Sequence, residues 1–198
     1  NKLIAFPNLE ASTYANRYEV GLPTSIVKLY KYIGINKESG LYEVEDVNND
    51  GVINVEDRQS KVNLGTTLFG GLNNSFRYRN WNIDFTWMFV KQRVYSPDYY
   101  GNSLGSFYNQ PNRLNDYFSQ ENKDALYQVP TTGANSMAMR AYQNFKSSDG
   151  VVTDGSYIRL KSLQIQYTVD SNWLKGKTLT ISMQGFNLIT ITKYWGND

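Results

Sequence analysis

The chain has 198 residues and a formal net charge of +2, with 40% hydrophobic and 15% aromatic residues. Cysteine and histidine are both absent, which excludes disulfides, thiolate chemistry, His-based acid/base catalysis and the commonest transition-metal ligand. The small net charge argues against a nucleic-acid partner, and no run is long and apolar enough for a membrane-spanning helix.

The first forty residues are loosely patterned. The chain begins without Met or a signal-type apolar core, so we expect it to be a piece of a larger protein or a processed product. Residues Ile26–Ile35 are rich in β-branched and aromatic side chains, which predicts a strand. A turn at Asn36–Gly40 follows, and Gly40–Glu45 reads as extended chain.

The next segment, "DVNNDGVINVED" at Asp46–Asp57, concentrates oxygen-bearing side chains. A twelve-residue calcium loop supplies ligands from positions 1, 3, 5, 7, 9 and 12 and has glycine at position 6, which is Gly51 here. The sequence therefore predicts a Ca²⁺ site with the ligands Asp46, Asn48, Asp50, Val52 (through its backbone carbonyl), Asn54 and Asp57. The alternative is an Asx-rich turn, whose side chains bond their own backbone.

Two features indicate the kind of metal loop. Asp57 stands at position 12, where sensor EF-hands have a bidentate glutamate, and the loop in this respect resembles those of dockerin-type modules. Flanking helices are not evident, which indicates a structural clamp rather than a switch. The all-oxygen ligand set favours Ca²⁺ over Mg²⁺.

Two strands follow, at Thr67–Arg79 and Trp81–Arg93. In the second, Ile83 and its alternate neighbours form an apolar face, and Asn82 and its alternate neighbours form a polar one. The connection through Arg79 and Asn80 is very short, which predicts a hairpin.

A long segment, Tyr95–Gly155, is rich in Asn, Ser, Gly, Asp and Tyr. Long loops of this kind are usually functional, and Asn112–Tyr127 could hold a short helix. Aromatic rings stack on sugar faces, so the candidate substrate-binding residues of this loop are Tyr99, Tyr100, Tyr108 and Tyr117. Trp195 is a further exposed-looking aromatic residue.

Strands return at Asp154–Val169 and Thr178–Thr190. The apolar phase shifts by one residue within the first of them, which predicts a bulge near Lys161–Ser162. Long strands joined alternately by short turns and long loops are typical of transmembrane β-barrels. A soluble β-sandwich alternates in the same way, so the pattern leaves both open.

Four segments of the sequence together resemble one family, the SusC/RagA-type TonB-dependent outer-membrane transporters. The first joins Gly34-Ile35-Asn36 and Ser39-Gly40 to the acidic loop, and the second is the hairpin at Phe69–Phe89. The third is "DGSYIRLKSLQIQYTV" at Asp154–Val169, with Ser162 in place of the family's usual Asn. The fourth is "GFNLITITKYWGND" at Gly185–Asp198.

The resemblance implies an all-β fold: antiparallel strands of a large transmembrane β-barrel with long extracellular loops, of which residues 1–198 are the C-terminal portion. Such a barrel belongs to the outer membrane of Bacteroidetes, where it contacts lipid. The resemblance implies that the barrel imports glycans or peptides together with a SusD-like surface lipoprotein, and that the transporter complex forms a dimer. The energy would come from the TonB complex through an N-terminal part of the transporter, which we expect to lie outside this chain. The resemblance further leads us to expect that the chain stops short of the family's last strand. The acidic loop and the loop at 95–155 would lie on the same, extracellular side.

Two other functions remain open from the residues alone. One is a soluble Ca²⁺-dependent carbohydrate-binding β-sandwich. The other is a carboxylate-based glycosidase, which needs a pair of acidic residues flanking a cleft. The long loop contains Asp98, Asp116, Glu121 and Asp124, but their spacing singles out no pair, and we expect a protein that is not an enzyme. The basic residues Arg77, Arg79, Arg159 and Lys161 are expected to face a lumen or lie near the short turns as solvated charges.

Overall fold

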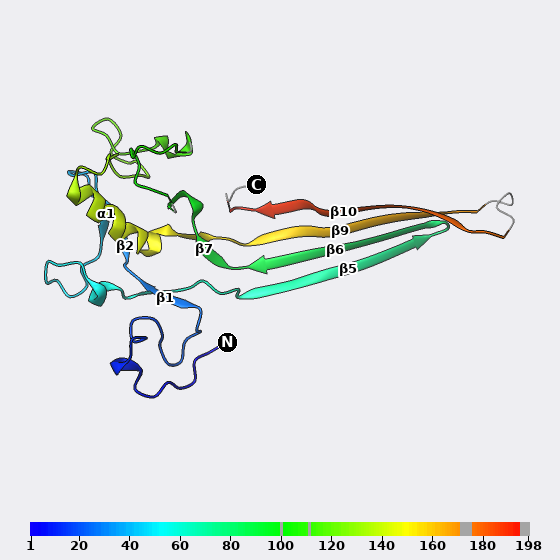
Figure 1. Ribbon diagram of the computed structural model, residues 1–198, viewed down its shortest axis with the longest axis horizontal. Coiled ribbons are helices and arrows are strands. Elements are labelled where there is room, and N and C mark those ends of the chain that lie inside the picture. The colour runs from blue at the N-terminus through cyan, green and yellow to red at the C-terminus, as the bar shows by residue number, and fades with distance from the viewer. Residues whose placement is uncertain (100, 111, 171–175, 195–198) are drawn as a thin grey trace. The chain divides into compact units, whose positions relative to one another are not determined.

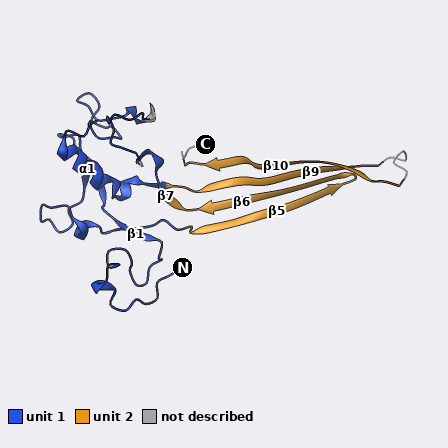
Figure 2. Ribbon diagram, in the orientation of Figure 1, with its two compact units in different colours: residues 1–65, 94–153, 196–198 blue, residues 66–93, 154–195 orange. Residues whose placement is uncertain are grey.

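The computed structural model describes residues 1–99, 101–110, 112–170 and 176–194 (Figure 1). The chain divides into two compact units (Figure 2). Residues 1–65 and 94–153 form the core of the first unit, and residues 66–93 and 154–195 form the second. Among the described residues, no helix has the length and apolar composition needed to cross a membrane.

The second unit is an antiparallel sheet of long strands in the order β10-β9-β6-β5. The strands are β5 (Leu68–Tyr78), β6 (Trp81–Lys91), β9 (Tyr157–Val169) and β10 (Leu179–Thr192). Tyr78 pairs with Trp81, so the predicted hairpin through Arg79 and Asn80 is confirmed. Each of the four strands is long enough to cross a bilayer, which takes about 9–11 residues of tilted strand.

The predicted bulge in β9 is also confirmed. Against β6, Thr86 pairs with Ser162 and Trp87 with Leu160, which leaves Lys161 as the extra residue. The register against β10 shifts at the same level, between Phe186 and Ile189. The bulge lets Leu160 and Leu163 lie on one face although they are three positions apart.

The first unit contains short strands. Strand β1 (Ile26–Leu29) pairs with β4 (Ser60–Asn63), and β2 (Tyr32–Ile35) pairs with β3 (Tyr42–Val44). The predicted single strand at Ile26–Ile35 is thus wrong in one respect, because it breaks at Tyr30 and Lys31. Tyr30 instead forms backbone hydrogen bonds with Ser147 and Asp149.

The short strands β7 (Arg93–Tyr95) and β8 (Val152–Asp154) pair with each other. Of these residues, only Arg93 and Asp154 fell within predicted strands, whereas Tyr95, Val152 and Thr153 were assigned to the long loop. Short 3-10 helices complete the described elements: Leu9–Ala11, Val55–Asp57, Pro97–Tyr99, Asn112–Asn115 and Asp149–Val151.

An aromatic cluster forms the core of the first unit. Tyr42 and Phe145 stack with ring centroids 3.9 Å apart, and Tyr32 and Tyr99 meet Phe145 edge-on. Gln128 is buried beside the cluster, where it accepts a hydrogen bond from the Tyr42 N–H and donates one to the Ala138 carbonyl. Residues 95–155 are therefore folded against the N-terminal part of the chain.

The α-helix of this unit, α1 (Ser136–Lys146), lies outside the segment where a helix was expected. Asn112–Tyr127 contains only a 3-10 turn, so that expectation is wrong. The Asn135 side chain caps α1 by accepting a hydrogen bond from the Ala138 N–H. Ala138, Tyr142 and Phe145 are buried at helical spacing, a signal that the polar composition of the loop concealed.

Candidate functional site

The acidic loop lies in the first unit and is held by its own side chains. The Asn48 Oδ1 accepts a hydrogen bond from the Asp50 N–H, and the Asp50 Oδ1 accepts one from the Val52 N–H at 2.7 Å. The Asn54 Oδ1 in turn accepts one from the Glu56 N–H. Gly51 has a φ of +79°, which only glycine adopts without strain. The loop thus has the Asx-turn bonding of the simpler alternative, and each oxygen keeps a lone pair.

Asp57 closes the loop from its far end. Its side chain is fully buried and accepts hydrogen bonds from the Val47 and Asn54 N–H groups at 2.9 and 2.8 Å. With Asn54 it forms a capping box on the short helix Val55–Asp57. The hydrogen bond from Asn54, followed by those from Val47 and Asn48, holds the pKa of Asp57 below its usual range.

Asp46 provides the observation that bears on a metal. Its Oδ2 accepts a hydrogen bond from the Gly51 N–H at 2.8 Å, whereas its Oδ1 is buried without a partner among the described residues. None of the loop's acidic side chains, Asp46, Asp50, Glu56 or Asp57, joins an ion pair in the described part of the chain. A buried carboxylate oxygen that lacks a donor fits a cation ligand.

The carboxylates are nevertheless not gathered into a cage. Within the described ranges, no three acidic side chains come together as a metal-binding cluster. A cation here would therefore take Asp46 together with amide and carbonyl oxygens of the loop, such as those of Asn48 and Val52. The residues fit a hard cation with oxygen ligands.

The candidate aromatic residues of the long loop have different surroundings. Tyr108 and Tyr117 are exposed and stay predicted substrate contacts. Tyr99 packs against Phe145 and Tyr127 in the aromatic cluster, and burial raises its pKa well above the usual range. Tyr100 and Trp195 lie outside the described residues.

The acidic residues of the long loop are dispersed. Asp116 accepts a hydrogen bond from the Asn122 amide, and Asp124 pairs with Lys37 at 2.6 Å. The described part of the loop holds no cluster of three acidic side chains. The arrangement gives no support to a carboxylate-based glycosidase.

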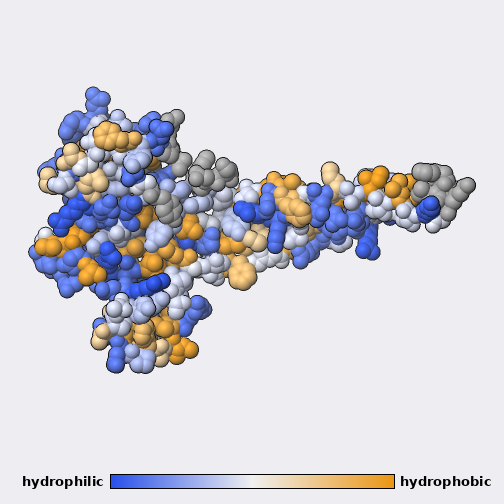
Figure 3. Space-filling model, in the orientation of Figure 1, coloured by the Kyte–Doolittle hydropathy of each residue, from blue (hydrophilic) through white to orange (hydrophobic). Residues whose placement is uncertain are grey.

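One face of the sheet in the second unit is apolar across all four strands. The paired rows Phe76–Ile83–Ile165–Met183 and Tyr78–Trp81–Tyr167–Ile181 run across it. Many of these side chains are exposed, among them Phe76, Met183 and Ile181, and Figure 3 shows apolar side chains along the strands. In the part of the chain that the structure describes, this apolar face belongs to a single layer of sheet. Exposed apolar patches of this width mark contact with lipid or with another protein surface.

The opposite face is polar over most of its length. Its rows include Arg77–Asn82–Gln166–Ser182 and Ser75–Asp84–Gln164–Gln184. The Asn82 side chain connects them by accepting a hydrogen bond from Arg77 and donating to Asp84 and Gln166. The alternation of polar and apolar faces is the pattern of a strand between lipid and water.

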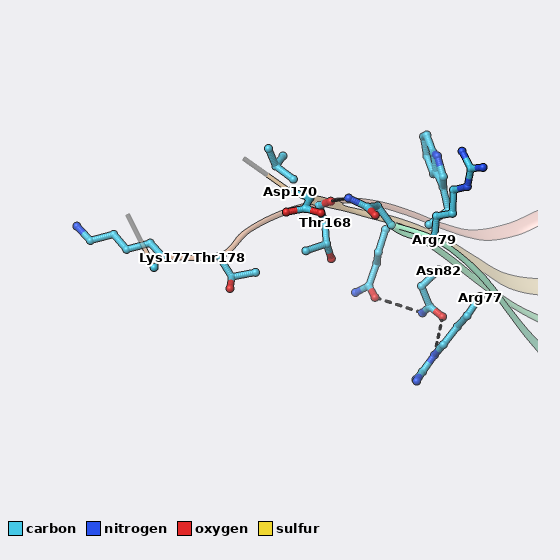
Figure 4. Close-up of a pocket in the computed structure, with 12 residues that line it drawn as sticks. Arg77, Arg79, Asn82, Thr168, Asp170, Lys177 and Thr178 are labelled. Carbon is cyan, nitrogen blue, oxygen red and sulfur yellow. Dashed lines mark hydrogen bonds between the residues drawn. The ribbon is translucent and has the colours of Figure 1, made fainter. Parts of the chain in front are cut away.

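A hollow of about 780 Å³ lies at the end of the polar face near the β5–β6 turn (Figure 4). Arg77, Arg79 and Lys177 line it together with Asp170. Asn80 also lines it, and its side chain donates a hydrogen bond to the Thr168 carbonyl at 2.8 Å. Arg77 and Arg79 lie at the short β5–β6 turn, which was one of the two positions expected for them.

Comparisons with known proteins place this fold. No protein-family model and no curated protein sequence matches the chain. Among solved structures, the RagAB peptide transporter matches with a TM-score of 0.68 and 20% identity, over 96% of this chain and 21% of the matched chain. The RagAB peptide importer matches in its "open-open" state with a TM-score of 0.66 and 20% identity, over 90% of this chain and 20% of the matched chain. It also matches in its "closed-closed" state with a TM-score of 0.62 and 18% identity, over 89% and 20%.

The expected fold is therefore confirmed. The chain has the antiparallel fold of one part of a RagAB-type transporter barrel, and its resemblance to the SusC/RagA-type transporters holds at the level of structure. It spans about a fifth of the length of the chains that it matches. The described sheet is open, with β5 and β10 as its edges.

Proposed function

We propose that the chain is a barrel segment of a TonB-dependent importer in the outer membrane. The observation that carries the proposal is the two-faced sheet of β5, β6, β9 and β10, whose apolar face is exposed and whose other face is polar. In a transmembrane barrel the apolar face meets lipid and the polar face lines a wet lumen. A soluble sandwich would need a second sheet over the apolar face.

The imported solute is a peptide or an oligosaccharide. The fold matches are to peptide transporters, which favours peptides. A SusD-like lipoprotein is the partner that we propose on the extracellular side, and Tyr108 and Tyr117 are the candidate contacts with the solute. Transport would depend on a TonB-linked segment of the same importer.

The acidic loop is the proposed Ca²⁺ clamp of the first unit. It would hold the ion through Asp46 and the amide and carbonyl oxygens of Asn48, Val52 and Asn54, and closure of the loop around the ion would bring in the carboxylates of Asp50 and Asp57. The supporting observation is that, among the residues that the structure describes, the buried Asp46 Oδ1 has no donor and the neighbouring loop carboxylates join no ion pair. The ion would neutralise this charge and stiffen a loop on the extracellular side, close to the folded segment 95–155.

Two neighbouring residues of β9 provide the test. Ile165 lies on the apolar face, in the row of Ile83 and Met183, and Gln164 lies on the polar face beside Asp84. A lipid-facing arginine costs up to about 2–4 kcal/mol at the bilayer midplane and less toward the interface, whereas a lumen-facing arginine costs little. We therefore expect Ile165→Arg to reduce the amount of full-length protein assembled in the outer membrane, and Gln164→Arg to leave it near the wild-type level. Equal tolerance of both variants would contradict a lipid-facing sheet.

A further inference from the structure

The polar face of the sheet changes character toward the end remote from the β5–β6 turn. By alternation, Phe69, Met88 and Val90 lie on the same face as Asn82 and Asp84. Phe69 is 76% exposed there. The interior of a wet barrel is polar, so an exposed apolar group on this face requires a separate explanation. A ligand-binding groove is one of the sites that such groups mark.

These apolar residues border a hollow of about 580 Å³. The hollow exists beside Gly71 because this residue has no side chain. A Cβ atom there would have one neighbouring atom within 4 Å, the Trp87 carbonyl oxygen at 3.2 Å. Gly70 differs, since a Cβ atom there would lie 2.5 Å from the Phe89 ring. Gly70 therefore makes room for a neighbouring ring, whereas Gly71 leaves open space beside Phe69 and Met88.

Two cationic side chains share this part of the face. Lys161 lines the hollow, where the bulge of β9 places it. Arg159 pairs with Met88 across the strands but does not line the hollow, because its side chain is directed toward β10. There it donates a hydrogen bond to the Thr190 hydroxyl at 3.0 Å, and it lies over the Tyr157 ring. In the described part of the chain, neither cation has an acidic partner within ion-pair distance.

We propose that this hollow binds an acidic peptide segment of the imported solute. An apolar side chain would lie against Phe69 and Met88, and an adjacent carboxylate would pair with Lys161. The inference rests on the proposed function, because this face borders a solute only if it lines a lumen. A neutral glycan offers neither the charge nor the aliphatic side chain, so the combination favours a peptide.

The test measures peptide binding to the full-length protein in detergent. The probe is a dansyl-labelled peptide with the sequence Gly-Glu-Leu-Glu-Gly, followed by fluorescence anisotropy, and its counterpart with glutamine in place of glutamate is the reference. We expect Lys161→Glu to weaken binding of the acidic probe by about tenfold or more, as for the loss of a charge-assisted contact. Arg77→Glu makes the same charge change on the same face near the far end of β5, and we expect it to change the affinity by less than about twofold.

A second variant tests the apolar half of the site. Gly71→Leu would fill the hollow without changing charge, and we expect it to weaken binding of both the acidic and the glutamine peptide. Equal weakening of binding by Lys161→Glu and Arg77→Glu would overturn the proposal, because it would indicate a long-range effect of charge on the polar face rather than a contact at the hollow. Unchanged binding in Gly71→Leu, or equal wild-type affinity for the two peptides, would overturn it as well. If Ile165→Arg and Gln164→Arg behave as expected above but the peptide-binding results contradict the proposal, the proposed importer stands and only the peptide site is wrong.

Discussion

The Asp57 carboxylate joins the two ends of the acidic loop, because its Oδ1 accepts a hydrogen bond from the Val47 N–H at 2.9 Å. Its other oxygen accepts one from the Asn54 N–H. The last proposed ligand therefore already has a structural task without any metal. The loop combines a self-bonded turn with acidic side chains that join no ion pair in the described part of the chain. The structural role of Asp57 and the proposed cation binding can be separated by mutation.

Replacing Asp57 with asparagine should loosen the loop. In the wild type, two carboxylate oxygens of Asp57 accept hydrogen bonds from two backbone N–H groups. The asparagine amide has only one acceptor oxygen, so one of these buried N–H groups would lose its partner. We expect faster proteolysis within residues 46–57 in Asp57→Asn, measured without added calcium. Glu56→Gln is the control, since the Glu56 side chain is exposed. Equal cleavage rates in the two variants would contradict a structural role for Asp57.

The same contact predicts a pH dependence. The pKa of Asp57 is lower in the folded protein than in an unfolded chain, where aspartate titrates near about 3.9. Its contribution to stability is thus complete above the unfolded value and is lost as the pH falls through the lower folded value. We expect loop proteolysis, followed with an acid-tolerant protease, to stay constant above about pH 5 and to rise below about pH 4. The acid step should shrink in Asp57→Asn, and an unchanged step would assign it to other carboxylates.

Calcium should stabilise the first unit through Asp46. Extracellular calcium modules bind with Kd values of roughly 10⁻⁴–10⁻³ M, so at ten times Kd the gain is about 1.4 kcal/mol. We expect Ca²⁺ to raise the thermal midpoint of the wild type more than Mg²⁺ does, and to have no effect in Asp46→Ala/Asp50→Ala. Asp124→Ala is the control, because Asp124 pairs with Lys37 outside the loop. A calcium response that survives in the double variant would exclude this loop as the site.

The long strands could be predicted from the sequence because their information is local. Alternation located β6 and β10 to within a few residues, and the phase shift at Lys161 located the bulge. The break at Tyr30 could not be predicted in this way, because its partners Ser147 and Asp149 lie more than a hundred positions away. Helix α1 could have been found from Asn135 and the spacing of its buried residues.

The candidate site also has parts that the sequence predicts and parts that it does not. The acidic loop is a local pattern, and its Asx turns follow from adjacent residues. The aromatic candidates depended on exposure, which sequence does not report, so Tyr99 was grouped with Tyr108 although its ring lies in a packed cluster. The hollow at Gly71 combines β5, β6 and the bulge of β9, and no single stretch of sequence contains it.

Gly150 should tolerate no side chain. A Cβ atom at this position would lie 2.6 Å from the Phe145 ring and 2.8 Å from the Tyr32 ring. Both rings belong to the aromatic cluster and cannot shift freely, so we expect Gly150→Ala to destabilise the first unit by about 1–3 kcal/mol. Gly101→Ala is the matched control, since a Cβ atom there meets nothing within 4 Å. Thermal unfolding should separate the two variants, and similar midpoints would show that the cluster is loosely packed.

Arg79 stores backbone strain in the β5–β6 turn. Its φ is +52° at the first of the two loop residues between Tyr78 and Trp81, a position where two-residue hairpins with positive φ prefer glycine. Its guanidinium lies 5.3 Å from the Tyr78 ring, a contact worth about 0.5–1 kcal/mol at an exposed site.

Arg79→Gly and Arg79→Val both remove this contact, so the difference between them reports the backbone alone. A non-glycine residue in the left-handed region costs roughly 1–2 kcal/mol, and a β-branched one is the least tolerant. We expect urea unfolding of the full-length protein in lipid vesicles to show Arg79→Gly more stable than Arg79→Val by about 1–2 kcal/mol. Equal midpoints would mean that the turn adopts a different backbone in the membrane-embedded protein.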